Sequence, residues 1–460
     1  MTLKKLFLLV FSIVLSMSIV HAQNPQPGAS GSGIEPHPLE GNGGYDILHM
    51  DLSLDWTMDE NVFTGIYTGE AVATQDLSQF NMDFVGYEIS LLQVNGVDVE
   101  FRREGYELII TPSDYLPDGE QFTILIHYSG MPESLSDPYS LYDPYGWFVD
   151  EDAAILLGGA YATASLYPSN YLDVMGFTVA VTVPEPMMAV GNGVLIDAID
   201  NGIDSTFVWR SQIDSIFSNL LIGQYRHDLI ATEIGVDINV YMLEEELTTP
   251  DDKLEEMLTL LSDAFGDYPF DELTIIHAPA IGRSGYADVG FIALGTFAVH
   301  DDLMVHELAH QWFGLTAWIQ SHEDRWINEG AASYVETLWL LRRVYYENPN
   351  DMDDILPGIL AIEWDNVYNL APIAVLPDGF DSVAVYERGR FTFLMLQHEV
   401  GTETFFEIMR EMLVRYRFDF VTTDDFVALS EEISGQDLSE FFDVLFYSEP
   451  LPPLAELGVE

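Results

Sequence analysis

Two histidines and two glutamates in the central part of the chain have the types and spacing of a metal-dependent hydrolytic site. His306, Glu307 and His310 form an H-E-x-x-H pattern, and Glu329 follows His310 after eighteen intervening residues. On a helix, residues four apart project from the same face, so both imidazoles can bind one ion. Two imidazoles and a carboxylate leave the fourth position of a tetrahedral zinc ion open for water. Glu307 lies beside the first ligand, where its carboxylate can take a proton from that water.

A second helix is predicted over residues 328–345, downstream of the two histidines. Glu329 and Glu336 are seven residues apart and share one face of this helix. A carboxylate two turns after a ligand is well placed to hydrogen-bond a ligand histidine, an arrangement that metal sites usually have. A solvated surface position for Glu336 is the alternative. A packed helix that carries H-E-x-x-H by chance is the alternative to the metal site itself.

These residues resemble the aminopeptidase N family of gluzincin zinc metallopeptidases. The run H-E-L-A-H-Q-W-F-G at 306–314, the spacing to Glu329 and the run W-I-N-E-G at 326–330 are similar to that family's motifs. The run Y-E-R-G at 386–389 is similar to its Y-x-K-G, whose tyrosine stabilises the tetrahedral intermediate. The resemblance therefore implies this role for Tyr386, and a phenol can donate a hydrogen bond to an oxyanion.

The resemblance also implies the fold, the metal and the substrates. It implies an N-terminal antiparallel β domain of saddle or sandwich form, followed by a thermolysin-like, mostly α-helical catalytic domain. It implies one Zn²⁺ per chain and peptide substrates. Only about ten residues follow Pro450, so the chain resembles a short form without the family's helical C-terminal domain.

One segment upstream of the histidines departs from the family pattern. The family carries G-x-M-E-N there, and its glutamate holds the free amino group of the substrate; residues 285–292 read G-Y-A-D-V-G-F-I. Aligned on the final Gly-Phe-Ile, the glutamate falls on Ala287 and the asparagine on Asp288, although Asp288 can bind the amine if the loop shifts by one residue. The predicted substrate-binding residues are Asp288, Gly290 and Phe291, with residues 290–294 as the edge strand beside the zinc.

Three functions remain open on these residues. The first is a secreted zinc aminopeptidase in which the free amine is only weakly required, so that blocked peptides are cleaved within roughly tenfold of free ones. The second is an endopeptidase of the same fold, because Ala287 stands where the amine-binding glutamate is expected. The third is a non-catalytic peptide-binding surface protein that keeps the zinc fold for stability.

The elements that must position these residues follow from hydrophobic periodicity. Apolar residues alternate with polar ones over 50–56, 122–128 and 177–183, which predicts strands, and Asn95-Gly96 predicts a hairpin turn. Beyond about residue 232 helical spacing dominates, so the fold class is α+β. The predicted divisions are a signal peptide at 1–22, a flexible tether at 23–44, a β domain at 45–230, the catalytic domain at 231–450 and a tail at 451–460.

The first residues have the pattern of a secretory signal. Lys4 and Lys5 precede an apolar run over 6–20, and Val20-His21-Ala22 ends in small residues, so we expect export after cleavage near Ala22. About fifteen apolar residues are too few for a comfortable membrane span, and no other run is long enough to cross a bilayer. The chain contains no cysteine, so an exported form would have no disulfides.

The chain is strongly acidic, with a formal net charge of −60, and Lys253 is the single lysine beyond residue 22. Such a field disfavours nucleic acid and anionic membranes as partners. A salty habitat, an acidic habitat or bound Ca²⁺ would each compensate for the repulsion, although no calcium motif is present; surface drift without a role is the alternative. No pattern in the sequence specifies the oligomeric state.

Overall fold

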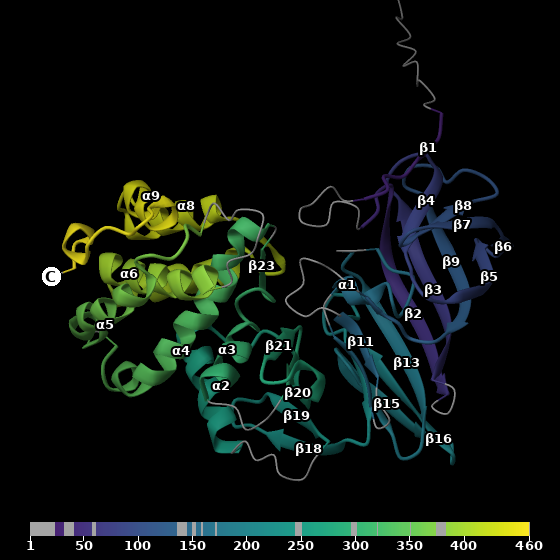
Figure 1. Ribbon diagram of the computed structural model, residues 1–460, viewed down its shortest axis with the longest axis horizontal. Helices are drawn as coiled ribbons and strands as arrows, with labels where there is room; N and C mark the ends of the chain where they lie inside the picture. The colour runs from purple at the N-terminus through teal and green to yellow at the C-terminus, as the bar shows by residue number, and fades with distance from the viewer. Residues whose placement is uncertain are drawn as a thin grey trace, which may run out of the picture.

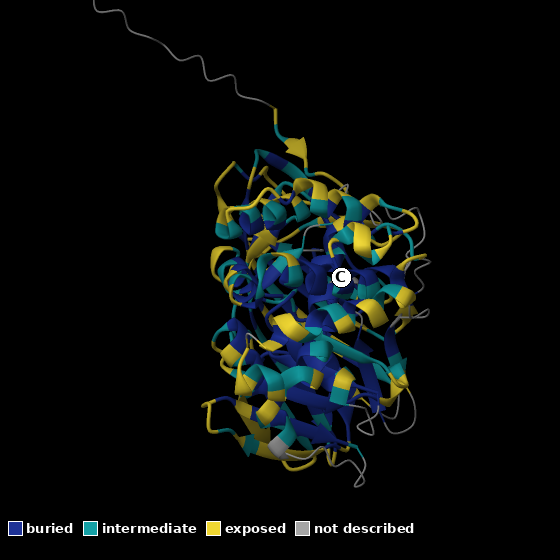
Figure 2. Cartoon of the chain, turned by 90° about the vertical axis from the view of Figure 1, so that its left-hand side faces the viewer, coloured by how far each residue is buried: buried dark blue, intermediate teal, exposed yellow. Residues whose placement is uncertain are grey.

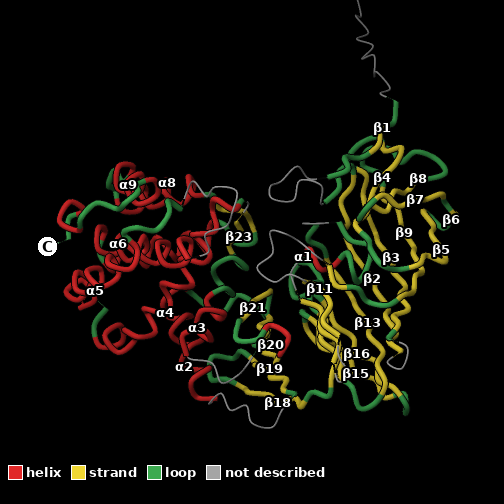
Figure 3. The backbone as a smooth tube through the Cα atoms, viewed as in Figure 1, coloured by secondary structure: helices red, strands yellow, loops and turns green. Residues whose placement is uncertain are grey.

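The computed structural model describes twelve ranges of the chain: 24–31, 41–57, 61–135, 145–149, 153–157, 160–170, 173–243, 251–295, 301–319, 321–349, 351–373 and 383–459. The predicted signal peptide at 1–22 lies outside them. A β-rich part and a helical part lie side by side, as Figures 1 and 3 show. The α+β fold class predicted from the sequence is therefore confirmed.

The β-rich part is built on an eight-stranded sheet that runs through its centre. The order of its strands is β15 (Val194–Asp200), β16 (Asp204–Arg210), β13 (Gly176–Pro184), β2 (Tyr45–Thr57), β3 (Val62–Ala73), β9 (Gln121–Gly130), β5 (Glu88–Val94) and β6 (Val97–Asp98). The predicted alternation is present over 50–56, 122–128 and 177–183: every second residue is apolar and buried, and the residues between them are exposed or partly exposed. The Asn95-Gly96 turn joins β5 to β6, and both residues have positive φ as a type I′ turn requires.

Two smaller sheets complete the β-rich part. One has the order β1 (Gln26–Pro27), β4 (Leu77–Asp83), β8 (Glu107–Thr111) and β7 (Glu100–Glu104). The other has the order β10 (Ser134–Leu135), β11 (Tyr145–Val149), β12 (Ala153–Leu157), β17 (Leu220–Gly223) and β14 (Met188–Gly191), and the short helix α1 (Ala160–Thr163) follows β12. The aromatic and aliphatic side chains between the sheets form one buried core.

The predicted tether is packed where the structure describes it. Strand β1 pairs in parallel with β4, and the Gly43 N–H donates to the carbonyl of Ala29. The glycine and proline content of residues 23–44 suggested a flexible segment because it lacks side chains that bury area. Here backbone hydrogen bonds attach residues 24–31 and 41–44 to the sheet, so the prediction is wrong for these residues.

A fourth sheet, of five strands, supports the part of the chain that is predicted to be catalytic. Its order is β18 (Arg226–Ala231), β19 (Asp237–Met242), β20 (Glu272–His277), β22 (Phe291–Leu294) and β21 (Gly285–Asp288). Because β18 pairs with β19 over its whole length, the predicted boundary at residues 230 and 231 cuts through a strand of this sheet. The chain passes from the β-rich part to the catalytic sheet between β17 and β18.

Helices cover this sheet and form the rest of the catalytic part. They are α2 (Asp251–Phe265), α3 (Asp301–Ala309), α4 (Arg325–Glu347), α5 (Asp351–Val367), α6 (Gly389–Val400), α7 (Thr402–Arg415), α8 (Thr423–Ser434) and α9 (Ser439–Tyr447). A π-helical turn, η4 (Ala384–Arg388), leads into α6, and the short strands β23 (Ala317–Ile319) and β24 (Asp419–Val421) pair in parallel. None of the helices in the described ranges is both long enough and apolar enough to span a membrane.

Helix α4 is the centre of the helical part. Figure 2 shows buried residues inside this part and exposed residues on its outer surface. Gly330 on α4 faces Gly389 at the start of α6, and a Cβ on Gly330 would lie 2.7 Å from the Gly389 Cα. This close approach requires glycine at both positions, and it brings the segment after η4 against the first turns of α4.

The predicted tail is also packed against the catalytic part. Leu451 is buried and its N–H donates to the carbonyl of Tyr368, while Trp364 Nε1 donates to the carbonyl of Pro452. Residues 454–457 form a short 3₁₀ turn, η5 (Leu454–Leu457). The segment 451–459 is therefore part of the fold rather than a free tail.

Candidate metal centre

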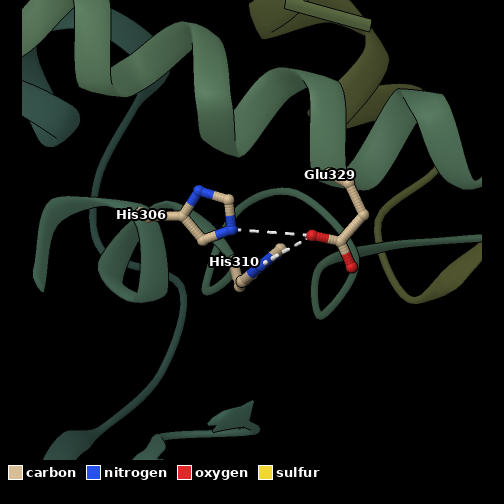
Figure 4. A group of neighbouring side chains, drawn as sticks. All are labelled: His306, His310 and Glu329. Atoms are coloured by element: carbon tan, nitrogen blue, oxygen red, sulfur yellow. Dashed lines mark ion pairs between the residues drawn. The ribbon is translucent and has the colours of Figure 1, made fainter. Parts of the chain in front are cut away.

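Two helices bring three potential metal ligands together. His306 lies on α3, His310 follows its last residue, and the N–H of His310 still donates to the carbonyl of His306. Glu329 lies in the second turn of α4. Figure 4 shows the Glu329 carboxylate facing both rings, with Oε2 at 3.5 Å from each Nε2. The predicted helix over 328–345 is present, extended slightly at both ends.

The three side chains fit a zinc ion. Their ligand atoms all lie within 4.8 Å of one another, and they form the one such group of three found in the described part of the chain. Oε2 of Glu329 is buried and has no hydrogen-bond partner. An unpaired, buried carboxylate oxygen is costly unless a cation compensates it. Two imidazole nitrogens and this oxygen are the donor set of a zinc site that retains one open position.

Each ligand is held from behind by a further side chain. The Nδ1 of His306 lies 2.8 Å from Glu336 Oε1, and the Nδ1 of His310 lies 2.6 Å from Asn328 Oδ1. The other oxygen of Glu329, Oε1, accepts from Arg325 at 3.4 Å. Because an oxygen occupies each Nδ1, each Nε2 is left free to face the metal. The structure thus places Glu336 where the sequence analysis expected it.

Asn328 and Arg325 were not singled out from the sequence as partners of the ligands. Asn328 belongs to the W-I-N-E-G run, which was the available signal for it. Arg325 stands four residues before Glu329 on the same helix, a spacing at which opposite charges meet. Burial opposes ionisation of Glu329, but the neighbouring histidines and Arg325 hold the pKa of its carboxyl well below the usual value.

Glu307 lies between the metal ligands and the edge of the catalytic sheet. Its side chain is buried, and a Cβ on Gly285 would lie 2.3 Å from its Oε1, so β21 packs directly against the carboxylate. Burial raises the pKa of Glu307, and the two imidazoles oppose this shift. A raised pKa suits a group that must first accept a proton and then release it.

The edge of the sheet beside Glu307 is β21, not residues 290–294. Strand β22 lies one position inward, between β20 and β21, and the outer side of β21 pairs with no other strand in the described ranges. An unpaired strand edge can add an extended peptide through main-chain hydrogen bonds. The prediction selected the wrong one of two short strands, because a glycine turn at residues 289 and 290 reverses the chain between them.

Tyr386 lies over the first ligand. Its ring stacks on that of His306 with 5.7 Å between centroids and an interplanar angle of 14°. It is carried by η4, a π-helical turn of the kind that often occurs at functional sites. Burial and the negative charge of Glu329 raise the pKa of the phenol, so the hydroxyl stays protonated near neutral pH.

The three predicted substrate-binding residues have different surroundings. Asp288 is partly exposed, and its Oδ2 accepts from Ser218 Oγ and from Asn219 Nδ2 at 2.8 Å. Gly290 has a positive φ, and its N–H donates to Gln311 Oε1 at 3.0 Å. Phe291 is fully buried in the core of the β-rich part, so its side chain cannot contact substrate. Of the three residues, only Asp288 has a side chain that can bind substrate.

A cavity of about 810 Å³ lies near the catalytic sheet but is not lined by the metal centre. Its walls include residues of β11 and β12 of the β-rich part, His277 at the end of β20, and Pro279 just after that strand. None of the three ligands, Glu307 or Tyr386 contributes to its lining. The candidate site is therefore identified from the geometry of the potential ligands and not from this cavity.

Comparison with known sequences finds peptidases. The model of the Peptidase family M1 domain matches residues 296–445. Aminopeptidase M1-B of Oryza sativa is 23% identical over 292 residues, covering 57% of this chain and 33% of that protein. Glutamyl aminopeptidase of Bos taurus is 28% identical over 236 residues, covering 45% and 24%. Aminopeptidase 2 of Candida albicans is 20% identical over 440 residues, covering 86% and 46%. The chain thus spans less than half the length of these curated relatives.

Solved structures share the whole described fold. The crystal structure of an M1 zinc metallopeptidase from Deinococcus radiodurans has a TM-score of 0.80 at 23% identity, covering 92% of this chain and 98% of that one. A variant from the same organism, bound to Tyr-Ser-Ala as substrate, has a TM-score of 0.79 at 24% identity and covers 92% and 99%. The domain match, the relatives and the ligand set on α3 and α4 agree, and residues 296–445 carry a domain similar to the Peptidase family M1 domain.

Proposed function

We propose that this protein is a zinc-dependent aminopeptidase, which removes residues from the N-termini of peptides. The observation that carries the proposal is the buried Oε2 of Glu329, which makes no hydrogen bond. It faces the Nε2 atoms of His306 and His310, beside Glu307 and the free edge of β21. In this arrangement a bound metal, the base and the free strand edge would lie close together, which supports the proposal. The aminopeptidase names of the relatives support the same class.

His306, His310 and Glu329 would hold zinc, which when bound lowers the pKa of water and polarises a carbonyl. Glu307 takes the proton of the attacking water and passes it to the leaving amine. Tyr386, protonated near neutral pH, donates its hydroxyl hydrogen to the oxygen that gains charge. Strand β21 pairs with the extended substrate and aligns its scissile bond with these groups.

Asp288 is our candidate for binding the free amine. Successive residues of a strand face opposite sides, so Asp288 faces away from Gly285 and Glu307, toward Ser218 and Asn219 of the β-rich part. Gly285 packs against Glu307, so the family motif G-x-M-E can be aligned with its glycine at Gly285. In this alignment the glutamate of the motif falls on Asp288. The Ala287 alignment used the far end of the segment, beyond the turn at Gly290. We therefore favour dependence on the amine over the weak dependence expected from the sequence.

Matched peptides with free and acetylated N-termini test this assignment. Loss of a charge–charge contact in a water-poor site costs about 2–5 kcal/mol, so kcat/KM should fall at least about tenfold on acetylation. In Asp288→Asn, which keeps the size of the side chain, that ratio should shrink toward one. The rate on the acetylated peptide is the internal control and should change little.

Equal rates on both peptides in the unaltered protein would favour the endopeptidase alternative. A peptide library read by mass spectrometry would then show internal cleavage instead of stepwise N-terminal loss. A protein that binds zinc but cleaves neither peptide would support the third alternative, a non-catalytic peptide-binding protein. The intact Glu307 and Tyr386 argue against that alternative.

A further inference from the structure

Arg390, in the first turn of α6, contacts carboxylates from three different elements. Its guanidinium lies 2.9 Å from Glu363 Oε2 on α5 and 3.8 Å from Glu336 Oε2 on α4, and it also pairs with Glu387 on η4. The side chains of Arg390 and Glu363 are mostly buried, with relative exposures of 14% and 16%. Solvent and salt therefore screen these ion pairs less than they screen ion pairs on the surface.

One of these carboxylates also holds a zinc ligand. Glu336 places Oε1 at 2.8 Å from the Nδ1 of His306, while its Oε2 faces Arg390. A single side chain therefore bridges the guanidinium and the imidazole. Because Oε1 is occupied by the imidazole, the position of Glu336 depends on what holds the rest of its carboxylate.

Arg390 is the one arginine or lysine of the described residues that pairs with these three carboxylates. Glu336, Glu363 and Glu387 pair with no other arginine or lysine of the described residues. Burial raises the pKa of Glu387, Arg390 lowers it, and the neighbouring Glu363 and Glu336 raise it again. The chain has 16 basic and 76 acidic residues, so few arginines or lysines are available to pair with carboxylates, and one of them lies here.

We propose that Arg390 is a positioning residue for the zinc site, acting through Glu336. It holds Glu336 so that the carboxylate fixes His306 with Nε2 directed toward Glu329. This inference rests on the proposed zinc-dependent function. A guanidinium can hold several carboxylate oxygens in a fixed planar arrangement, which an ammonium group cannot reproduce. A carboxylate on Nδ1 in turn fixes the orientation of a ligand imidazole and increases its basicity.

The same guanidinium links the metal centre to the tyrosine above it. Glu387 directly follows Tyr386, whose ring stacks on His306. Arg390 therefore connects η4, which carries Tyr386, to α4, which carries Glu329 and Glu336. Loss of Arg390 would release both the carboxylate behind His306 and the turn that carries the phenol.

Zinc affinity in a double-mutant cycle tests the inference without relying on turnover. The four proteins are the unaltered chain, Arg390→Gln, Glu336→Gln and the double variant. The dissociation constant for zinc alone is measured by competition with a chromophoric chelator, and the thermal midpoint is measured on the metal-free proteins. Loss of such an outer partner typically weakens metal binding about 10- to 100-fold, which we expect for each single variant.

The cycle separates positioning from a general structural role. If Arg390 acts through Glu336, Arg390→Gln in the Glu336→Gln background should weaken zinc binding by less than about threefold more. Arg390→Lys keeps the charge without the planar fork and should lie between the unaltered protein and Arg390→Gln. The matched control is Arg415→Gln, which removes an exposed arginine paired with Glu411 and Glu432 and should leave zinc affinity unchanged.

The outcomes distinguish the inference from the function on which it rests. Equal losses of zinc affinity from Arg390→Gln in both backgrounds, or no loss in either, would overturn the positioning role. If Arg390→Gln does not fold, the Arg390→Lys cycle with Glu336→Gln decides by the same criterion. An unaltered protein that binds no zinc would overturn both the inference and the proposed function.

Discussion

Glu307→Gln should lower kcat by at least about a hundredfold, the usual scale for a lost general base, while the protein keeps its zinc. Glutamine has nearly the same size as glutamate, so the contact with Gly285 on β21 is retained. It cannot accept the proton of the attacking water. Turnover of one quenched peptide and zinc content by atomic absorption are the two measurements.

The histidine variant provides the contrast for this experiment. Glu307 is not one of the three residues whose ligand atoms face one another across the site. His310 is one of them, through its Nε2. His310→Ala should therefore lose metal and activity together, and Glu307→Gln should lose activity alone. Near-normal turnover by Glu307→Gln would show that another group is the base.

Tyr386→Phe should lower kcat by about ten- to a thousandfold with little change in KM. The change removes one hydroxyl and keeps the ring that stacks on His306, so substrate binding in the ground state should persist. An interaction made only in the transition state affects kcat, and the range is that of one lost oxyanion donor. Steady-state kinetics on the same peptide gives both constants.

An exposed tyrosine far along the chain serves as the control for this variant. Tyr447, at the end of α9, is 53% exposed, and Tyr447→Phe should leave both constants unchanged. If Tyr386→Phe instead raises KM while kcat holds, Tyr386 binds substrate and does not stabilise the transition state. The role implied by the family resemblance would then be wrong.

The strands and helices of this fold could be predicted from the sequence where the hydrophobic pattern extends over many residues. In β2 from Met50 to Trp56 and in β13 from Phe177 to Val183, every second residue is apolar and buried. The H-E-x-x-H spacing predicts that both imidazoles share a face, because helix geometry alone determines which residues do so, and both Nε2 atoms lie 3.5 Å from Glu329 Oε2. Leu254, Leu258 and Leu261 of α2 are buried for the same reason.

Short elements and contacts between distant residues could not be predicted this way. Strands β21 and β22 have four residues each, too few for a periodicity that distinguishes the edge strand from its neighbour. The partners of Asp288 stand 69 and 70 residues earlier in the chain, and Arg390 follows its partner Glu336 by more than fifty residues. The packing of α4 against α6, through Gly330 and Gly389, brings the latter pair together.

The most direct test of the proposed function is to measure whether peptide cleavage depends on bound zinc. Protein stripped of metal by a chelator and dialysed should cleave no peptide, and activity should return in proportion to added zinc up to one ion per chain. His310→Ala, treated in the same way, should recover no activity. Cleavage by the metal-free protein at the original rate would contradict the assignment of His306, His310 and Glu329 as the centre of the chemistry.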